Sequence, residues 1–146
     1  MSETCIRVMI VDDDPAHAEA IQRYLEDSGM AARIQVASSL QEFRNATAID
    51  PPDIALVDLN LPDGRAVEIL SSPPESGPFP ILIMTSYGNE QIAVEVLKSG
   101  ALDYFVKTPA AFEDIPRTVA RSMREWKLLQ ERKNIEEALR EILDGT

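Results

Sequence analysis

The sequence predicts an α/β domain in which a five-stranded parallel sheet is covered by helices on both faces. Short apolar runs alternate along the chain with segments of helical periodicity, in the order βαβαβαβαβα. The chain has 146 residues, enough for one ordinary domain to bury a core without disulfides or structural metals. Strands that alternate with helices in this way pair in parallel and form a doubly wound sheet.

The five expected strands are short, apolar and separated by turn or helix signals. They span residues 5–11, 33–37, 53–58, 81–84 and 103–106. The fourth is almost continuously apolar, as strands are when both faces of a parallel sheet are buried. The pattern is that of a flavodoxin-like (βα)5 fold.

The expected helices begin and end at local signals. Pro15 suits the first turn of a helix that stops at Gly29, and Gly100 suits the end of a helix over 89–99. Further helices are expected over residues 40–46, over 65–70 and, as one long helix, over 112–143.

The long last helix exceeds what is needed to cover the sheet. We therefore expect a body over residues 1–125 and a helical extension over 126–146. Leu128, Ile135 and Ile142 recur every seven residues, with Leu139 on the same stripe. Two heptads fall short of a coiled-coil prediction. The extension is either a solvated helix or a linker that dimerises or carries a signal onward.

Composition excludes several classes of protein. The net charge of −11 argues against direct nucleic-acid binding, because an acidic body repels phosphate backbones. Cys5 is the only cysteine, so there is no disulfide framework or zinc cluster, and we expect it to be buried ahead of the first strand. We see no signal peptide and no membrane span, and expect a cytoplasmic protein.

Polar side chains follow four of the five strands. Ligands of open parallel sheets bind beyond the carboxyl ends of the strands, so these side chains share one edge. Each alone has an ordinary explanation as a helix cap, a turn residue or a solvated charge, but their joint placement favours a site. They are Asp12, Asp13 and Asp14 after the first strand, Asp58 and Asn60 at the third, Thr85 and Ser86 at the fourth, and Lys107 at the fifth.

Clustered carboxylates of this kind need a cation or bound protons to remain together. Oxygen ligands with room for water favour Mg²⁺, or Mn²⁺. A carboxylate beside such a cation can attack a phosphorus atom and form an acyl phosphate. The cation and a lysine would stabilise the oxygens of the transferring group, and a threonine hydroxyl could bond one of them afterwards.

Four motifs occur in an order and spacing that resemble one known family. They are "VMIVDDDP", "ALVDLNLPDG", "ILIMTSYG" and "GALDYFVKTP". Together they resemble the receiver domain of bacterial two-component response regulators, over about residues 5–125. The resemblance implies a phosphoacceptor signalling domain rather than an enzyme. Its phosphoryl donor would be a histidine kinase or phosphotransfer protein, and its output a conformational switch.

The resemblance also implies roles for individual residues. Asp58 would be the phosphoacceptor, Lys107 its ion-pairing ammonium and Thr85 the switch hydroxyl. Tyr104 would be the aromatic residue that turns inward with Thr85, and the face around it could form a homodimer, as could the last helix.

The same resemblance implies a metal site. Asp13 and Asp58 would bind Mg²⁺ directly, Asp12 would bind it through water, and Asn60 would offer its backbone carbonyl.

Two features depart from the family or stand outside it. Thr108 separates Lys107 from Pro109, where the family has a lysine followed by a cis proline. The loop is either rebuilt or keeps a cis Lys107–Thr108 bond at a cost of about 2.5–4 kcal/mol. His17, the only histidine, is expected to be an ordinary surface residue.

Two alternative functions come from other classes. One is a Mg²⁺-dependent phosphatase of the haloacid-dehalogenase type, whose nucleophilic aspartate and second aspartate would be Asp12 and Asp14. The chain has no cap domain for that role, and Asp58 would then have no function. The other is a phosphorylation-independent binding module, which the loss of Asp58, Thr85 or Lys107 would favour.

Overall fold

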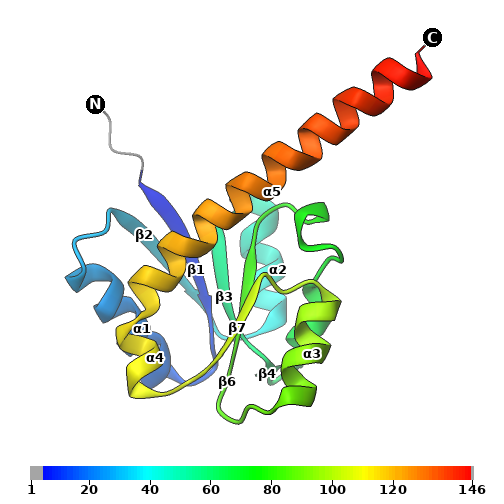
Figure 1. Ribbon diagram of the computed structural model, residues 1–146. Helices are drawn as coiled ribbons and strands as arrows, with labels where there is room; N and C mark the ends of the chain where they lie inside the picture. The colour runs from blue at the N-terminus through cyan, green and yellow to red at the C-terminus, as the bar shows by residue number, and fades with distance from the viewer. Residues whose placement is uncertain (1–4, 146) are drawn as a thin grey trace.

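The computed structural model describes residues 5–145, in which a five-stranded sheet lies between two layers of helices (Figure 1). The strands of this sheet are β1 (Ile6–Val11), β2 (Ala32–Ala37), β3 (Ile54–Asp58), β6 (Ile81–Thr85) and β7 (Asp103–Val106). They lie in the order β2-β1-β3-β6-β7, and every neighbouring pair is parallel. The predicted fold class is confirmed. The chain reverses direction across the sheet between β1 and β3, which makes that position the topological switch point.

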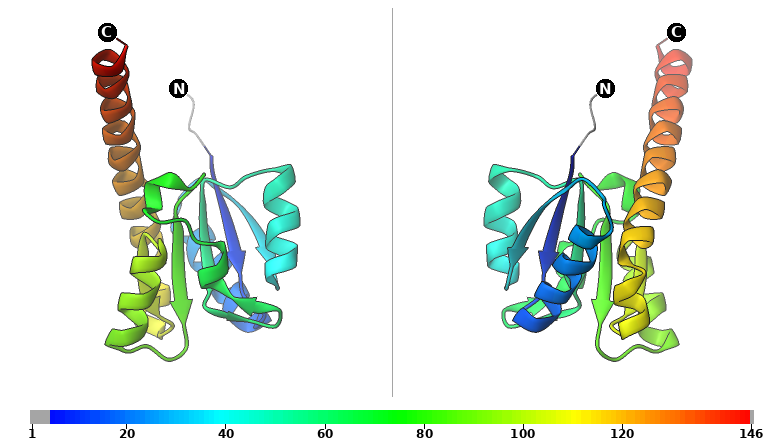
Figure 2. Two further views of the ribbon diagram at one scale, coloured as in Figure 1. Left: turned by 90° about the vertical axis from the view of Figure 1, so that its right-hand side faces the viewer. Right: turned by 90° about the vertical axis from the view of Figure 1, so that its left-hand side faces the viewer.

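Helices cover both faces of the sheet in two pairs (Figure 2). The first pair is α1 (Pro15–Asp27) and α5 (Ile115–Asp144), and the second is α2 (Leu40–Ile49) and α3 (Glu90–Ser99). Alternate residues of β1 serve the two layers: Ile10 packs with α1 and α5, and Met9 packs with α2 and α3. Both side chains are fully buried, which stabilises the fold by about 1.5–3 kcal/mol each. Burial on both faces explains why the strands read as apolar runs.

The segment between β3 and β6 differs from the prediction. The expected helix over 65–70 is present only as the 3₁₀ helix η1 (Ala66–Ile69). It follows a hairpin of β4 (Asn60–Leu61) and β5 (Gly64–Arg65) and precedes a second 3₁₀ helix, η2 (Pro74–Ser76). Starting an α-helix fixes several residues for one hydrogen bond. The few residues between the hairpin and the prolines can form too few α-helical hydrogen bonds to offset that cost, so the chain forms tighter, shorter turns.

The turn of this hairpin secures the start of α2. The Asp63 carboxylate accepts the backbone N–H groups of Leu40 at 2.8 Å and Gln41 at 2.9 Å. These two hydrogen bonds lower the pKa of Asp63 below its ordinary value. The turn-rich motif after Asp58 therefore has a structural role as a helix cap.

The loop after β7 is rebuilt around Thr108. Its side chain accepts the Ala111 N–H at 3.1 Å and caps the short helix α4 (Pro109–Glu113). Within residues 5–145 the cis peptide bond is Ser72–Pro73, so the Lys107–Thr108 bond is trans. The predicted long helix is thus divided in two, and α5 begins only at Ile115.

Helix α5 has an inner half that packs on the body and an outer half that extends past the sheet (Figure 1). Ile115 and Val119 are buried against the sheet. Further along, Gln130 Nε2 and Lys133 Nζ both donate to the Glu75 carbonyl oxygen in η2, at 3.0 and 3.3 Å. The helix is continuous through residue 126, so the boundary between body and extension stays a prediction. Across residues 5–145, the structure contains no helix with both the length and the apolar character of a membrane span.

Candidate functional site

The switch point of the sheet carries the predicted acidic cluster. Asp12 directly follows β1 and Asp58 ends β3, and these strands are parallel neighbours. Carboxylate oxygens of Asp12, Asp13 and Asp58 all lie within 4.8 Å of one another. The structure thus brings together the three carboxylates that sequence reasoning placed at one edge.

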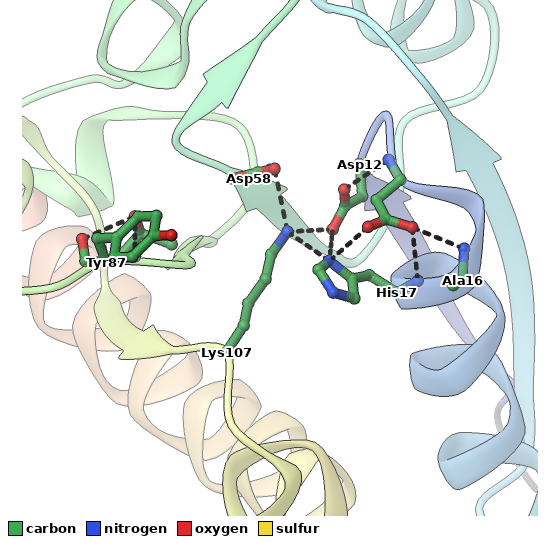
Figure 3. A network of polar contacts seen from close by, with 8 residues as sticks. Asp12, Ala16, His17, Asp58, Tyr87 and Lys107 are labelled. Atoms are coloured by element: carbon green, nitrogen blue, oxygen red, sulfur yellow. Dashed lines mark hydrogen bonds and ion pairs between the residues drawn. The ribbon is translucent and has the colours of Figure 1, made fainter.

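Lys107 joins this cluster from the end of β7 (Figure 3). Its Nζ atom lies 3.0 Å from Asp58 Oδ2 and donates a hydrogen bond to it. It also lies 2.6 Å from Asp12 Oδ2, with which it forms an ion pair. The Lys107 side chain is only 3% exposed, so its charge is held inside the protein by the two aspartates.

Burial and charge shift the proton affinities at the site. The pKa of Asp58 is raised, because burial and the neighbouring Asp12 charge outweigh the hydrogen bond and charge of Lys107. Burial alone would lower the pKa of Lys107, but hydrogen bonds and charges of Asp12 and Asp58 raise it above its ordinary value. Three carboxylates and one ammonium leave two negative charges uncompensated. Oxygen ligands with this charge fit a divalent cation.

The third acidic residue of the motif has a different task. Asp14 Oδ1 accepts the backbone N–H groups of Ala16 at 2.9 Å and His17 at 3.4 Å, capping α1. Desolvation would raise the Asp14 pKa, but these hydrogen bonds together with nearby positive charge lower it. Engagement as a cap weighs against a phosphatase mechanism that needs Asp14 beside a nucleophilic Asp12.

The structure does not bring the Thr85 hydroxyl to Asp58. Thr85 Oγ1 donates to the Tyr87 carbonyl at 3.0 Å and accepts the Tyr87 N–H at 3.3 Å (Figure 3). Thr85 lies at the end of β6, as predicted, and it is almost fully buried. Its hydroxyl is held by the loop that follows β6.

Tyr104 lies in β7 and packs against the core between the sheet and the layer of α2 and α3. Its hydroxyl is buried and has no hydrogen-bond partner among residues 5–145. Gly88 covers it so closely that a Cβ there would collide with the Tyr104 hydroxyl and with Val106. The aromatic ring is therefore already inward in this structure, although Thr85 faces its own loop.

His17 is part of the site, and its prediction as an ordinary surface residue is wrong. Its Nδ1 atom lies 3.2 Å from Lys107 Nζ and 3.4 Å from Asp14 Oδ2 (Figure 3). One signal in the sequence could have revealed this. His17 is in the first turn of a helix that starts at the site, and helical side chains lean toward the helix N-terminus.

Asn60 lies in β4, two residues beyond Asp58, and is exposed. A hydrogen bond from the Asn60 backbone to the Asp58 carboxylate acts to lower the pKa of Asp58. Its predicted role, as a carbonyl ligand of a metal ion, stays a prediction.

The fold and the site together define a flavodoxin-like α/β domain with a cluster of carboxylates around a lysine at its switch point. A family model described as "Response regulator receiver domain" matches residues 8–120, and this chain belongs to that family. It is therefore a signalling domain of two-component regulation, and nothing in the comparisons supports the phosphatase alternative.

Similar proteins include longer regulators. The methanogenesis regulatory protein FilR1 of Methanothrix harundinacea is 35% identical over 130 residues, which cover 86% of this chain and 29% of FilR1. The acid tolerance regulatory protein ActR of Rhizobium meliloti is 35% identical over 109 residues, 74% of this chain and 55% of ActR. The chain thus spans about a third to about half of the length of these relatives.

Solved receiver domains have the same fold. A CheY-like response regulator receiver domain protein from Methanospirillum hungatei superposes with a TM-score of 0.72 and 26% identity, covering 85% of this chain and 98% of that one. The receiver domain of a putative LuxO repressor from Vibrio parahaemolyticus gives a TM-score of 0.75 at 24% identity, covering 86% and 95%.

Proposed function

We propose that this chain is a phosphoacceptor whose Asp58 receives a phosphoryl group in a reaction that depends on Mg²⁺, with Mn²⁺ as a substitute. It turns over no separate substrate; its chemistry is its own phosphorylation and dephosphorylation. One observation carries the proposal. The Asp58 carboxylate ends a buried strand 3.0 Å from the Lys107 ammonium, with oxygens of Asp12 and Asp13 within 4.8 Å.

The reaction follows from these positions. An oxygen of Asp58 attacks the phosphorus atom, the bond from phosphorus to the leaving group breaks, and the leaving group keeps the electron pair. The product is an acyl phosphate on Asp58. Lys107 donates a hydrogen bond to a phosphoryl oxygen and stabilises the charge that develops there. Water later attacks the same phosphorus and restores the carboxylate and inorganic phosphate.

The metal-binding part of the proposal rests on the uncompensated charge of the cluster. Asp13 and Asp58 would bind the cation directly, Asp12 would bind it through water, and Asn60 would add its backbone carbonyl. Bound there, Mg²⁺ neutralises carboxylate repulsion and lets an anionic phosphoryl group approach.

The donor would be a histidine kinase or a phosphotransfer protein in the cytoplasm. Several relatives are named as transcriptional regulators and are much longer than this chain. The net charge of −11 argues against nucleic-acid binding by the receiver itself, so any such output would belong to another domain or partner.

The output of the receiver would be a change around Tyr104 and α5. The Thr85 hydroxyl would leave the Tyr87 backbone and bond a phosphoryl oxygen, which repositions the loop that covers Tyr104. The beryllofluoride-activated receiver domain of NtrC4, which has the same fold, was solved as a dimer. We infer that this chain also self-associates, through the stripe of Leu128, Ile135, Leu139 and Ile142 or through the face around Tyr104.

Acetyl phosphate with Mg²⁺ tests the phosphoacceptor. Intact-mass measurement should show one added phosphoryl group on the wild type and none on Asp58→Asn. Asp27→Asn, at the exposed end of α1, is the matched control and should be labelled like the wild type. Chelation of Mg²⁺ should suppress labelling. Equal labelling of Asp58→Asn and wild type would refute the assignment.

Sedimentation tests the self-association. The full chain and a version ending near Trp126 should be compared with and without beryllofluoride. Association that needs residues 127–146 assigns the interface to the outer half of α5. Equal association of the short version assigns it to the face around Tyr104, and monomers throughout would reject self-association.

A further inference from the structure

We propose that His17 is a positioning residue for Lys107: a neutral imidazole whose Nδ1 atom accepts the third hydrogen of the lysine ammonium. This inference rests on the proposed phosphoacceptor function, because its consequence is the orientation of Lys107 toward Asp58.

The Lys107 ammonium has three hydrogens, and three acceptors surround it. Asp12 Oδ2 lies at 2.6 Å, Asp58 Oδ2 at 3.0 Å and His17 Nδ1 at 3.2 Å from Nζ (Figure 3). An ammonium group can donate but cannot accept a hydrogen bond. The Nδ1 atom of His17 must therefore offer its lone pair, and the ring hydrogen must be on Nε2.

Two carboxylates face the same nitrogen and could compete with Lys107. Asp14 Oδ2 lies 3.4 Å from His17 Nδ1, and Asp12 Oδ2 lies 3.9 Å from it. A bond to either carboxylate would require a hydrogen on Nδ1, which would then point toward the Lys107 ammonium. The contact with Lys107 is the shortest of the three, and it is compatible only with an unprotonated Nδ1.

The orientation of the ring is set by the rebuilt loop after Lys107. Phe112 of α4 meets the imidazole edge to face, with ring centroids 5.8 Å apart and planes at 70°. The capping of α4 by Thr108 gives this helix its start, and α4 in turn supplies Phe112. The inserted Thr108 and the unexpected histidine therefore belong to one local arrangement on both sides of Lys107.

This arrangement leaves one N–H of Lys107 directed at the reacting group. Asp12, directly after β1, and His17, in α1, restrain the Lys107 ammonium. Phosphorylation modifies neither residue covalently. The remaining hydrogen points to the Asp58 carboxylate. After phosphorylation, the same hydrogen can bond a phosphoryl oxygen on Asp58, where the negative charge then lies. Without His17 the ammonium would be free to rotate, and part of this orientation would be lost.

Two substitutions separate positioning from simple packing. Asn can place its side-chain oxygen close to the position of Nδ1, whereas Leu fills a similar space without an acceptor. Labelling of Asp58 by acetyl phosphate should be about fivefold slower in His17→Leu, the effect of losing one hydrogen bond. In His17→Asn it should stay within about twofold of the wild type. Equal rates in all three proteins, or equal slowing in both variants, would overturn the positioning role.

A spectroscopic test is independent of phosphorylation. His17 is the only histidine, so ¹⁵N spectra of the unphosphorylated chain contain one imidazole. In mildly alkaline buffer the proposal requires the Nε2–H tautomer, with Nδ1 shifted as an acceptor, and Lys107→Met should change the Nδ1 signal. An Nδ1–H tautomer would contradict the inference. Failure of wild-type labelling would instead refute the phosphoacceptor proposal and leave the tautomer result standing.

Discussion

The body of the receiver and the outer half of α5 place their apolar side chains in opposite environments. In the body, Leu56 and Met84 are fully buried between sheet and helices. In the outer half of α5, Leu128 is 65% exposed and Ile142 is 66% exposed. The strands of the body are thus covered by its own helices, whereas the extension presents an exposed apolar stripe that another molecule or domain could cover.

The same two regions differ in their charges. The body buries an ammonium between two carboxylates at the switch point, and its Lys107 side chain is 3% exposed. The charges of the outer helix form exposed pairs such as Arg132 and Glu136, 3.1 Å apart. Exposed pairs contribute about 0–1 kcal/mol, and buried charges without a partner cost several times more. Stability should therefore depend on the body, and association on the extension.

The largest expected effect comes from the core. Leu56→Ala should lower the free energy of unfolding by about 3–4 kcal/mol, because it removes a fully buried side chain and leaves a cavity in the sheet. Urea denaturation of the full chain measures this difference. A loss below about 1 kcal/mol would show that the core near β3 can collapse around the smaller side chain.

Breaking the buried charge cluster should have the next largest effect. Lys107→Met leaves Asp12 and Asp58 without their cation, and should lower the free energy of unfolding by about 2–3 kcal/mol in metal-free buffer. Added Mg²⁺ should restore part of this loss if the carboxylates bind it. Arg121→Met is the matched control: it removes an exposed pair with Asp103, 3.1 Å apart. Its effect should stay below about 1 kcal/mol.

The packing of Tyr104 can be tested with Gly88→Ala. The new methyl group would collide with the Tyr104 hydroxyl, so we expect a loss of about 1–3 kcal/mol, as in other overpacked sites. In a Tyr104→Phe background the same substitution should cost less, because the hydroxyl is gone. A double-mutant cycle by thermal unfolding measures the coupling. Purely additive effects would place the ring away from Gly88.

The raised pKa of Asp58 predicts a pH dependence. A raised carboxyl pKa means that the folded state holds the proton more tightly than the unfolded state, whose pKa is near 3.8. Stability is therefore lost as pH rises from that value through the folded pKa. Asp58→Asn removes this effect and should raise the melting temperature at neutral pH in metal-free buffer. The gain should shrink as pH falls toward 3.8. A difference in melting temperature that stays constant over this pH range would contradict the raised pKa of Asp58.

The smallest expected effect on stability is in the extension. Leu128→Ala makes the same chemical change as Leu56→Ala at an exposed position, and should alter the free energy of unfolding by less than about 0.5 kcal/mol. It should nevertheless weaken self-association in sedimentation, if the stripe forms the interface. A large loss of monomer stability would show that the Leu128 side chain packs on the body.

Much of the architecture followed from local pattern. The alternation of apolar runs with helical segments predicted the parallel sheet. The polar residues after those runs predicted the meeting of Asp12, Asp13, Asp58 and Lys107 at one edge. Parallel strands bring their carboxyl ends to one edge wherever the helices between them lie, so strand identity determined this shared edge. The strand order then determined which of these residues meet. Cap signals were equally local, and the cap formed by Asp14 is where the sequence places it.

Other features depended on contacts between distant segments, and only the tertiary structure decided them. Cys5 is exposed, contrary to expectation, because burial at a strand end depends on what covers it. The environment of His17 was decided by Lys107 and Phe112, which lie more than 80 residues further along the chain. The directions of the Thr85 and Tyr104 side chains depend on the loop that contains Tyr87 and Gly88. Sequence periodicity determines which face of an element is apolar, but the orientation of a polar side chain depends on partners that only the folded chain brings within reach.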